Sequence, residues 1–232
     1  MFAYGSLMFE PELPEAVIER VPARLPGWRR TFNKISLRRA TPRDQSFDAF
    51  EDVPREFRRG DRNLSLALGT EPAAPDDAIV GELQVYPGAV REELLRLLDR
   101  REGFDAARPM VENGYRRAEV EVVRDNGAQA KAITYLTNDT PGCALVVGEE
   151  CDLATRARIL VNATPRASQS GEGAIARGLE YLEGCRASLR AVGIVDPALE
   201  ELAGAIRARP GAWVERVWPP EAGEPGEWNV GR

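Results

Sequence analysis

Any acid–base chemistry in this chain depends on side chains other than histidine, because its 232 residues contain none. A Ser-His-Asp triad, a Cys-His pair and a histidine-bound metal are therefore excluded. Proton transfer near neutral pH falls to a carboxylate, a lysine, a tyrosine or a cysteine. The leading candidate for a general base is a Glu or Asp whose surroundings raise its pKa.

Glu102 is the carboxylate whose position fits that description. It lies at the C-terminal end of a predicted amphipathic helix, Val90–Arg101, immediately before Gly103. The negative end of the helix dipole and burial beside Phe104 would both raise the pKa of its carboxyl group. A solvated glutamate in a charged helix end is the alternative. Likewise, Arg101 either orients a substrate carboxylate through two hydrogen bonds or is a solvated charge that suits the dipole.

A second candidate is the opening stretch FAYGSLMFEPELP, an apolar run that breaks after Tyr4 at Gly5, Ser6 and Leu7. The pattern predicts a short strand that enters a tight turn, with Gly5 supplying the positive φ angle that such turns often require. Backbone N–H groups of such a loop are not used by a sheet and can bind an anion. An ordinary strand and turn would produce the same residues.

The three cysteines, Cys143, Cys151 and Cys185, are odd in number and widely spaced. This argues against a disulfide framework and against a metal site of the Cys-x-x-Cys type. A catalytic thiol is the chemical alternative to a buried cysteine that packs as a small apolar side chain.

The elements that must position these candidates fall into two blocks. Strand-like alternation comes first, at Trp28–Leu37, Leu64–Leu68, Ile79–Tyr86, Arg116–Arg124 and Ala128–Asn138. The last two runs flank Asp125-Asn126-Gly127, which is a hairpin signal. Helical patterns dominate afterwards, at Asp152–Ala163, Ala174–Val192 and Ala198–Arg207, with Gly193 and Pro197 at helix ends. The segment Pro14–Arg20 indicates no particular element.

Strands followed by helices predict one α+β domain over residues 1–232, or a barrel with helices packed outside it. Residues 38–62 are rich in Arg, Asp and Pro and are interpreted as a surface loop or insertion. The tail 210–232, with Pro219, Pro220 and Pro225, is interpreted as an irregular C-terminal wrap.

Several stretches together resemble the γ-glutamylcyclotransferase family, in particular its ChaC-like, glutathione-specific branch. The opening FAYGSLMFEPELP is similar to that branch's FGYGSLIWxPxF, with Leu7 where the other branch has Asn. LLDRREGF is similar to the motif that delivers the family's catalytic Glu. Three further segments match the GYxRRF strand, the Tyr-led hairpin and the helical tail: Gly27–Ser36, Tyr115–Asp139 and Glu180–Ile206.

The resemblance implies a small mixed β-barrel flanked by helices, and a lyase reaction that needs neither metal nor cofactor. A γ-glutamyl compound, glutathione in the ChaC-like branch, cyclises to 5-oxoproline and releases its amine, Cys-Gly. Glu102 would act as the general acid and base. Tyr4, Gly5, Ser6 and Leu7 would hold the substrate or its oxyanion, and Tyr115 would either donate a phenolic hydrogen bond to it or pack as a half-buried residue.

Alternatives within and outside this chemistry stay open. The leaving half of the substrate could differ, giving another γ-glutamyl amide or amine. A non-catalytic protein of the same fold would bind a small ligand, and a protein-interaction module would use residues 38–62. The net charge of −6 gives nucleic acid or an anionic membrane no electrostatic help as a partner. We expect a cytoplasmic protein that binds a small molecule, since no signal or membrane-spanning pattern is present.

Overall fold

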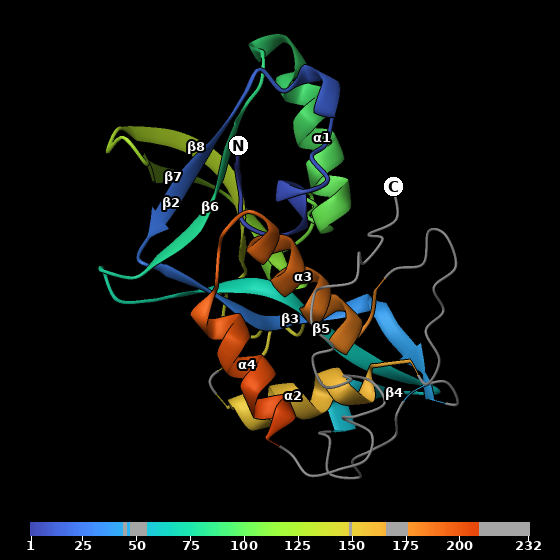
Figure 1. Ribbon diagram of the computed structural model, residues 1–232. Coiled ribbons are helices and arrows are strands. Elements are labelled where there is room, and N and C mark those ends of the chain that lie inside the picture. Colours follow the sequence, from blue (N-terminus) through green and yellow to red (C-terminus); the bar gives the residue numbers. More distant parts are fainter. Residues whose placement is uncertain (44–45, 47–54, 149, 166–175, 209–232) are drawn as a thin grey trace. The chain divides into compact units, whose positions relative to one another are not determined.

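The computed structural model describes residues 1–43, 46, 55–148, 150–165 and 176–208 (Figure 1). The chain divides into two compact units. The first unit consists of Met1–Lys34 and Leu68–Val146, and the second of Ile35–Ala67 and the chain from Val147 onward. The predicted C-terminal wrap, 210–232, lies outside the described residues.

The first unit is built on a five-stranded sheet with the order β1-β6-β2-β7-β8. Its strands are β1 (Phe2–Ala3), β2 (Glu19–Pro26), β6 (Ala78–Val85), β7 (Tyr115–Arg124) and β8 (Gln129–Thr137). The pairings described between them are all antiparallel. The β7–β8 hairpin turns at Gly127, which has a φ of 80°, as its sequence predicts.

Two hydrogen bonds join the first and last strands of this sheet. The Thr134 hydroxyl donates to the Phe2 carbonyl at 2.9 Å, and the Tyr4 hydroxyl donates to the Tyr135 carbonyl at 2.6 Å. The sheet is therefore a nearly closed, barrel-like structure. This confirms the predicted α+β fold with a small β-barrel and helices, although the described pairings are antiparallel and not mixed.

Strand β2 is an element that the sequence did not reveal. Its sequence ERVPARLP contains two prolines, which lack a backbone donor and are uncommon inside strands. Ala23 and Leu25 are nevertheless buried at 0% and 2% exposure, and Pro22 pairs with Glu82 of β6. Burial on one face of the sheet thus outweighs the local preference.

Helix α1 (Arg91–Glu102) belongs to the first unit and ends as predicted. Leu94 and Leu98 form its buried face. Gly103 adopts a left-handed conformation with a φ of 70°, and its N–H donates to the Asp99 carbonyl. A glycine ends the helix here because it adopts this conformation without the steric cost that a Cβ imposes.

The second unit contains α2 (Leu153–Asn162), α3 (Leu179–Ala191) and α4 (Pro197–Arg207). Asp152 and Asp196 cap α2 and α4 by accepting hydrogen bonds from backbone N–H groups, and these two helices lie where the sequence predicts them. Helix α3 begins later than the predicted Ala174, which lies outside the described residues. Gly178 precedes it with a φ of 53°, and a Cβ there would lie 2.5 Å from the Leu160 carbonyl oxygen.

A three-stranded sheet has the order β3-β5-β4. Strands β3 (Trp28–Pro42) and β5 (Arg62–Pro72) contribute residues to both units, and β4 is Arg58–Arg59. The prediction of a surface loop over 38–62 is wrong at both ends, since β3 continues to Pro42 and Phe57 is buried at 3% exposure. The charged composition hid the end of this strand, in which Arg38 is exposed and Ala40 and Thr41 are buried. Residues 44–45 and 47–54 lie outside the described part.

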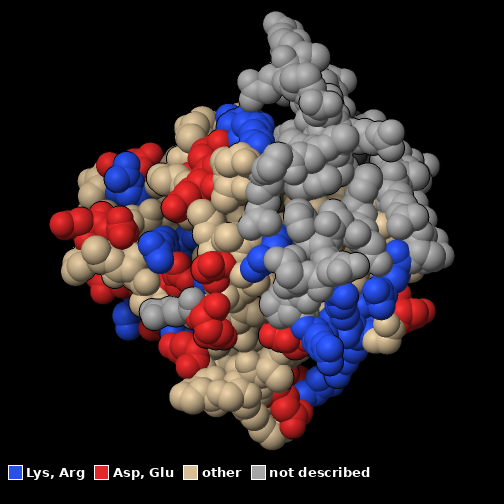
Figure 2. Space-filling view, turned by 90° about the horizontal axis from the view of Figure 1, so that it is seen from below, with Lys and Arg blue, Asp and Glu red and all other residues tan. Residues whose placement is uncertain are grey.

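Acidic and basic side chains are interspersed over most of the described part of the face shown in Figure 2, and Lys and Arg side chains gather along one edge of it. Within the described ranges, none of the helices is long and apolar enough to span a membrane.

Candidate active site

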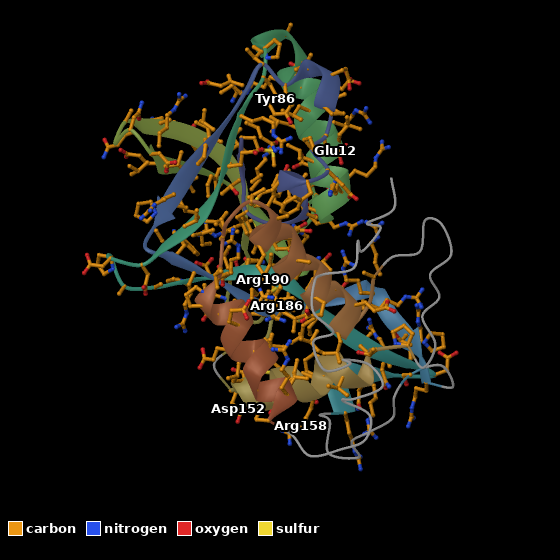
Figure 3. All side chains as sticks on the ribbon, in the orientation of Figure 1. Glu12, Tyr86, Asp152, Arg158, Arg186 and Arg190 are labelled. Atoms are coloured by element: carbon orange, nitrogen blue, oxygen red, sulfur yellow. The ribbon has the colours of Figure 1, made fainter. Side chains whose placement is uncertain are left out.

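The last turn of α1 is bound directly to the opening loop of the chain. The Arg101 guanidinium donates to the Ser6 hydroxyl oxygen at 3.2 Å and to the Glu10 carbonyl at 2.8 Å. It also forms ion pairs with the carboxylates of Glu10 at 3.4 Å and Glu12 at 3.2 Å. Glu12, labelled in Figure 3, lies beside α1. Arg101 therefore joins the helix end to the residues that follow the Tyr-Gly-Ser turn.

Glu102 is the residue next to this contact and the last residue of α1. Its side chain is 18% exposed, so the carboxylate is largely buried. One carboxylate oxygen lies 4.0 Å from the Arg101 Nε atom, which is the outer limit of an ion pair. Glu102 is thus a partly buried carboxylate at the negative end of a helix, one residue from the contact with Ser6.

Buried side chains hold two carbonyl groups of the opening loop. Arg30, 1% exposed, donates from Nε to the Tyr4 carbonyl at 2.8 Å. Gln84, 0% exposed, donates from Nε2 to the Leu7 carbonyl at 2.9 Å. A trans peptide group is planar, so fixing the Tyr4 carbonyl also fixes the direction of the Gly5 N–H on the other side of that peptide.

The opening loop contains a short 3-10 turn, Ser6–Met8. The N–H groups at the start of such a turn have no acceptor within it. In that turn the Met8 N–H donates to the Gly5 carbonyl at 2.9 Å. Among the described residues, the N–H groups of Gly5, Ser6 and Leu7 have no acceptor. They are the donors with which the loop could bind a carboxylate or an oxyanion.

The prediction of a positive φ at Gly5 is wrong: its φ is −133°. Its lack of a side chain matters for another reason. A Cβ at this position would lie 3.2 Å from the Leu68 Cδ2 atom, tighter than most contacts of real Cβ atoms. The close approach of the loop to β5 therefore explains the glycine.

The two predicted tyrosines are buried, and their hydroxyl groups bond to backbone. Tyr4, 8% exposed, donates to the Tyr135 carbonyl of β8. Tyr115, 6% exposed, donates to the Leu68 carbonyl, and Lys34 Nζ lies 4.5 Å from the centre of its ring. The Tyr4 side chain therefore helps to close the barrel-like sheet, and the Tyr115 side chain joins β7 to β5.

Sequence reasoning missed a second set of contacts at the end of α1. The Tyr135 hydroxyl donates to one carboxylate oxygen of Asp99 at 2.6 Å, and Arg117 Nη1 donates to the other at 2.6 Å. Burial, together with the hydrogen bond to Asp99, raises the pKa of Tyr135. The only signal in the sequence is that Asp99 precedes Glu102 by three residues on a helix, which places both on one face.

Cys143, Cys151 and Cys185 are free thiols in this structure. Cys143 and Cys151 are buried and Cys185 is partly exposed. Burial raises the pKa of Cys151. A raised pKa keeps the thiol protonated at neutral pH, which opposes a nucleophilic role.

No family model matches this sequence. No curated protein matches it either. Among solved structures, a selenomethionine-labelled γ-glutamyl cyclotransferase specific to glutathione from yeast is similar, with a TM-score of 0.58 and 19% identity, covering 89% of this chain and 94% of the yeast chain. A second structure of a yeast glutathione-specific γ-glutamyl cyclotransferase gives 0.56 and 20% identity, covering 89% and 96%. The chain therefore has the fold of the γ-glutamyl cyclotransferases.

Proposed function

We propose that this protein is a γ-glutamylcyclotransferase that converts a γ-glutamyl compound into 5-oxoproline and a free amine. The observation that carries the proposal is the hydrogen bond from Arg101 to Ser6 at 3.2 Å. It brings the helix end with Glu102 to the loop whose N–H groups are available, inside a fold shared with enzymes of this activity. A general base and an anion-binding loop are the two parts that the reaction requires.

In the proposed mechanism, Glu102 removes a proton from the α-ammonium group of the substrate. The resulting amine attacks the substrate's own γ-carbonyl carbon, and a new C–N bond closes the five-membered ring. The former amide C–N bond then breaks as the protonated Glu102 donates its proton to the leaving nitrogen. The regenerated carboxylate accepts the surplus proton of the ring nitrogen and passes it to the released amine, which leaves as an ammonium ion. No water, metal or oxidant is consumed, and one carboxylate serves all the proton transfers.

The N–H groups of Gly5, Ser6 and Leu7 have the second task in this mechanism. A flexible γ-glutamyl chain must be held in a curled conformation before its two ends react. N–H donors that bind its α-carboxylate, or the negative charge that develops on the γ-carbonyl oxygen, would supply that constraint. Arg30 and Gln84 support the role because they bind the carbonyl groups of the same loop.

Glutathione is the substrate that we propose first, with Cys-Gly as the released amine. The support is the specificity of the yeast enzymes with the same fold, together with the likeness of the opening stretch to the ChaC-like branch. Another γ-glutamyl amide or amine would undergo the same ring closure, because the chemistry involves only the glutamyl half. A ligand-binding protein without activity is a second candidate, but it would have no use for Glu102.

The test is to incubate the purified chain with glutathione and a panel of γ-glutamyl amides and amines, and to measure 5-oxoproline. Glu102→Gln keeps the size of the side chain and removes the base, so kcat should fall by about 10²- to 10⁴-fold. Glu93→Gln, an exposed position in the first turn of the same helix, is the matched control and should keep full activity.

The outcomes separate the proposals. Faster turnover of glutathione than of the rest of the panel supports glutathione as the substrate. Faster turnover of another compound would change the proposed substrate but not the mechanism. An active Glu102→Gln variant would overturn the mechanism. Binding of γ-glutamyl compounds without any 5-oxoproline would favour the ligand-binding protein.

A further inference from the structure

We propose that Asp99 is a positioning residue, which acts with Tyr135 to place Glu102 against the opening loop. The inference rests on the proposed function. Asp99 and Glu102 lie three residues apart in the final turn of α1. Contacts that hold Asp99 in place therefore also hold the backbone of Glu102. The proposal assigns Asp99 no direct contact with the substrate.

The Asp99 side chain is held by two strands at once. Tyr135 of β8 and Arg117 of β7 each donate to a different carboxylate oxygen at 2.6 Å. Asp99 is 24% exposed at its side chain and Arg117 is 31% exposed, so the contacts are only partly screened by solvent. Hydrogen bonds to a charged acceptor are the stronger kind and have narrower geometry.

The Asp99 backbone closes the helix that carries Glu102. Its carbonyl oxygen accepts from the N–H of Gly103 and from the N–H of Phe104, the latter at 2.9 Å. Glu102 therefore lies inside a loop of backbone whose two ends meet at one carbonyl group. Movement of Asp99 would move the whole helix end.

The residue after this turn packs against the same two side chains. The Phe104 ring meets the Tyr135 ring edge-on, with centroids 6.4 Å apart and an interplanar angle of 70°. The Arg117 guanidinium carbon lies 5.4 Å from the centre of the Phe104 ring. Tyr135 and Arg117 thus hold the chain on both sides of Glu102.

Tyr135 also connects this helix end to the proposed substrate loop. Its hydroxyl donates to Asp99, whereas its carbonyl oxygen accepts from the Tyr4 hydroxyl at 2.6 Å. Arg101 provides a separate link from the helix end to Ser6. Glu102 is therefore fixed to the loop by two routes, one through buried β8 and one through the partly exposed Arg101.

This arrangement predicts a defect in the chemical step when the network is cut. Rates depend steeply on the position of reacting groups, and a displacement of about 1 Å can cost about 100-fold. Tyr135→Phe keeps the ring that packs on Phe104 and removes only the hydroxyl. We expect kcat to fall by about 10- to 100-fold, with KM changed by less than about threefold.

The experiment measures kcat and KM for Tyr135→Phe, Asp99→Asn and the double variant, beside the affinity of each for 5-oxoproline. If both residues act through one contact, the double variant should be about as slow as the slower single variant. Asp105→Asn is the control, because Asp105 forms an exposed ion pair with Arg108 at 3.1 Å. Should Asp99→Asn fail to fold, Tyr135→Phe carries the test.

The possible failures are distinct. If Tyr135→Phe loses thermal stability but keeps the wild-type kcat, the tyrosine is only structural and the positioning role is overturned. A rise in KM and in the Kd for 5-oxoproline at an unchanged kcat also overturns it, because the network would then serve substrate binding. If the wild-type chain turns over no γ-glutamyl compound, the proposed function fails, and the inference falls with it.

Discussion

One ionic cluster of the described residues lies at the end of α1 and another lies between α3 and α4, and the two differ in the partners of their charged groups. The cluster at the end of α1 joins Arg101 and Asp99 to strands and to a loop distant in sequence. The cluster between α3 and α4 is local: Arg186 of α3 binds Glu183 one turn earlier and Glu200 of the next helix. Arg186, labelled in Figure 3 with Arg190, is 1% exposed at its side chain.

The pKa values of the two carboxylates that Arg186 binds are shifted in opposite directions. The hydrogen bond from Arg186 lowers the pKa of Glu200 below its ordinary value. Burial raises the pKa of Glu183, although Arg186 also binds it. Desolvation therefore outweighs the ion pair at Glu183, whereas the hydrogen bond outweighs desolvation at Glu200.

The α3–α4 cluster stabilises the contact between two helices, whereas the α1 cluster is proposed to position Glu102. In the α3–α4 cluster, charged groups satisfy one another between neighbouring helices. In the α1 cluster, Asp99 and Arg101, the neighbours of Glu102 on the helix end, bind two strands and a loop that are distant in sequence.

The largest effect on stability should come from Arg186→Met. It removes the buried cation that Glu183 and Glu200 share and leaves Glu200 paired with the partly exposed Arg190, so the free energy of unfolding should fall by about 3–5 kcal/mol. Urea unfolding measures this, while activity per folded molecule should stay at the wild-type level. Arg190→Met, at a side chain that is 46% exposed, is the matched control and should cost less than about 1 kcal/mol. Equal losses in the two variants would contradict a cluster centred on Arg186.

The next effect should come from Arg101→Gln and should appear in catalysis. The ion pairs of Arg101 involve partly exposed carboxylates, so their loss should cost less than about 1 kcal/mol of stability. The loop would however lose its direct link to the helix end, and we expect kcat/KM to fall by about 10-fold or more. Kinetics with glutathione and thermal unfolding measure the two effects. A loss of stability without a change in kcat/KM would make Arg101 a structural residue.

The sequence indicates the ends of elements well, because those ends depend on single residues. Gly103 ends α1 and Gly127 turns the β7–β8 hairpin, each with a positive φ that glycine adopts readily. Strand β2 escaped detection because its two prolines oppose the strand signal locally. Its position is decided by burial against β6 and β7, which the sequence does not display.

The candidate site divides in the same way. Glu102 and the opening loop were predicted because each combines a residue type with a local signal. The network of Asp99, Tyr135 and Arg117 was missed, because Asp99 and Tyr135 are 36 residues apart and meet only when the sheet forms. Contacts of this kind follow from tertiary structure and leave no pattern within one element.

Tyr115→Phe should have a smaller effect that tests the predicted substrate contact. It removes the hydrogen bond from the Tyr115 hydroxyl to the Leu68 carbonyl, which should cost about 1 kcal/mol of stability. KM for glutathione should stay unchanged, since the hydroxyl is used within the barrel. Thermal unfolding and steady-state kinetics decide the matter. A rise in KM at unchanged stability would instead make this hydroxyl a substrate ligand.

The smallest effect is the dependence of the α3–α4 cluster on pH. Glu200 has a lowered pKa, so its contribution to stability is complete above its ordinary pKa and is lost as the pH falls through its value in the folded state. Glu183 has a raised pKa, so its contribution is complete below the ordinary pKa and is lost as the pH rises through its folded value. The two residues therefore act with opposite slopes.

This opposition can be measured with two isosteric variants and urea unfolding at a series of pH values from neutral to acid. Glu200→Gln removes the group that favours higher pH, so stability should fall less steeply towards acid than in the wild type. Glu183→Gln removes the opposing group, so the fall should be steeper. Parallel curves for the two variants would mean that the carboxylates share Arg186 equally. Unequal solvation would then no longer distinguish Glu183 from Glu200. The α1 cluster and the α3–α4 cluster would differ only in which residues their charged groups bind.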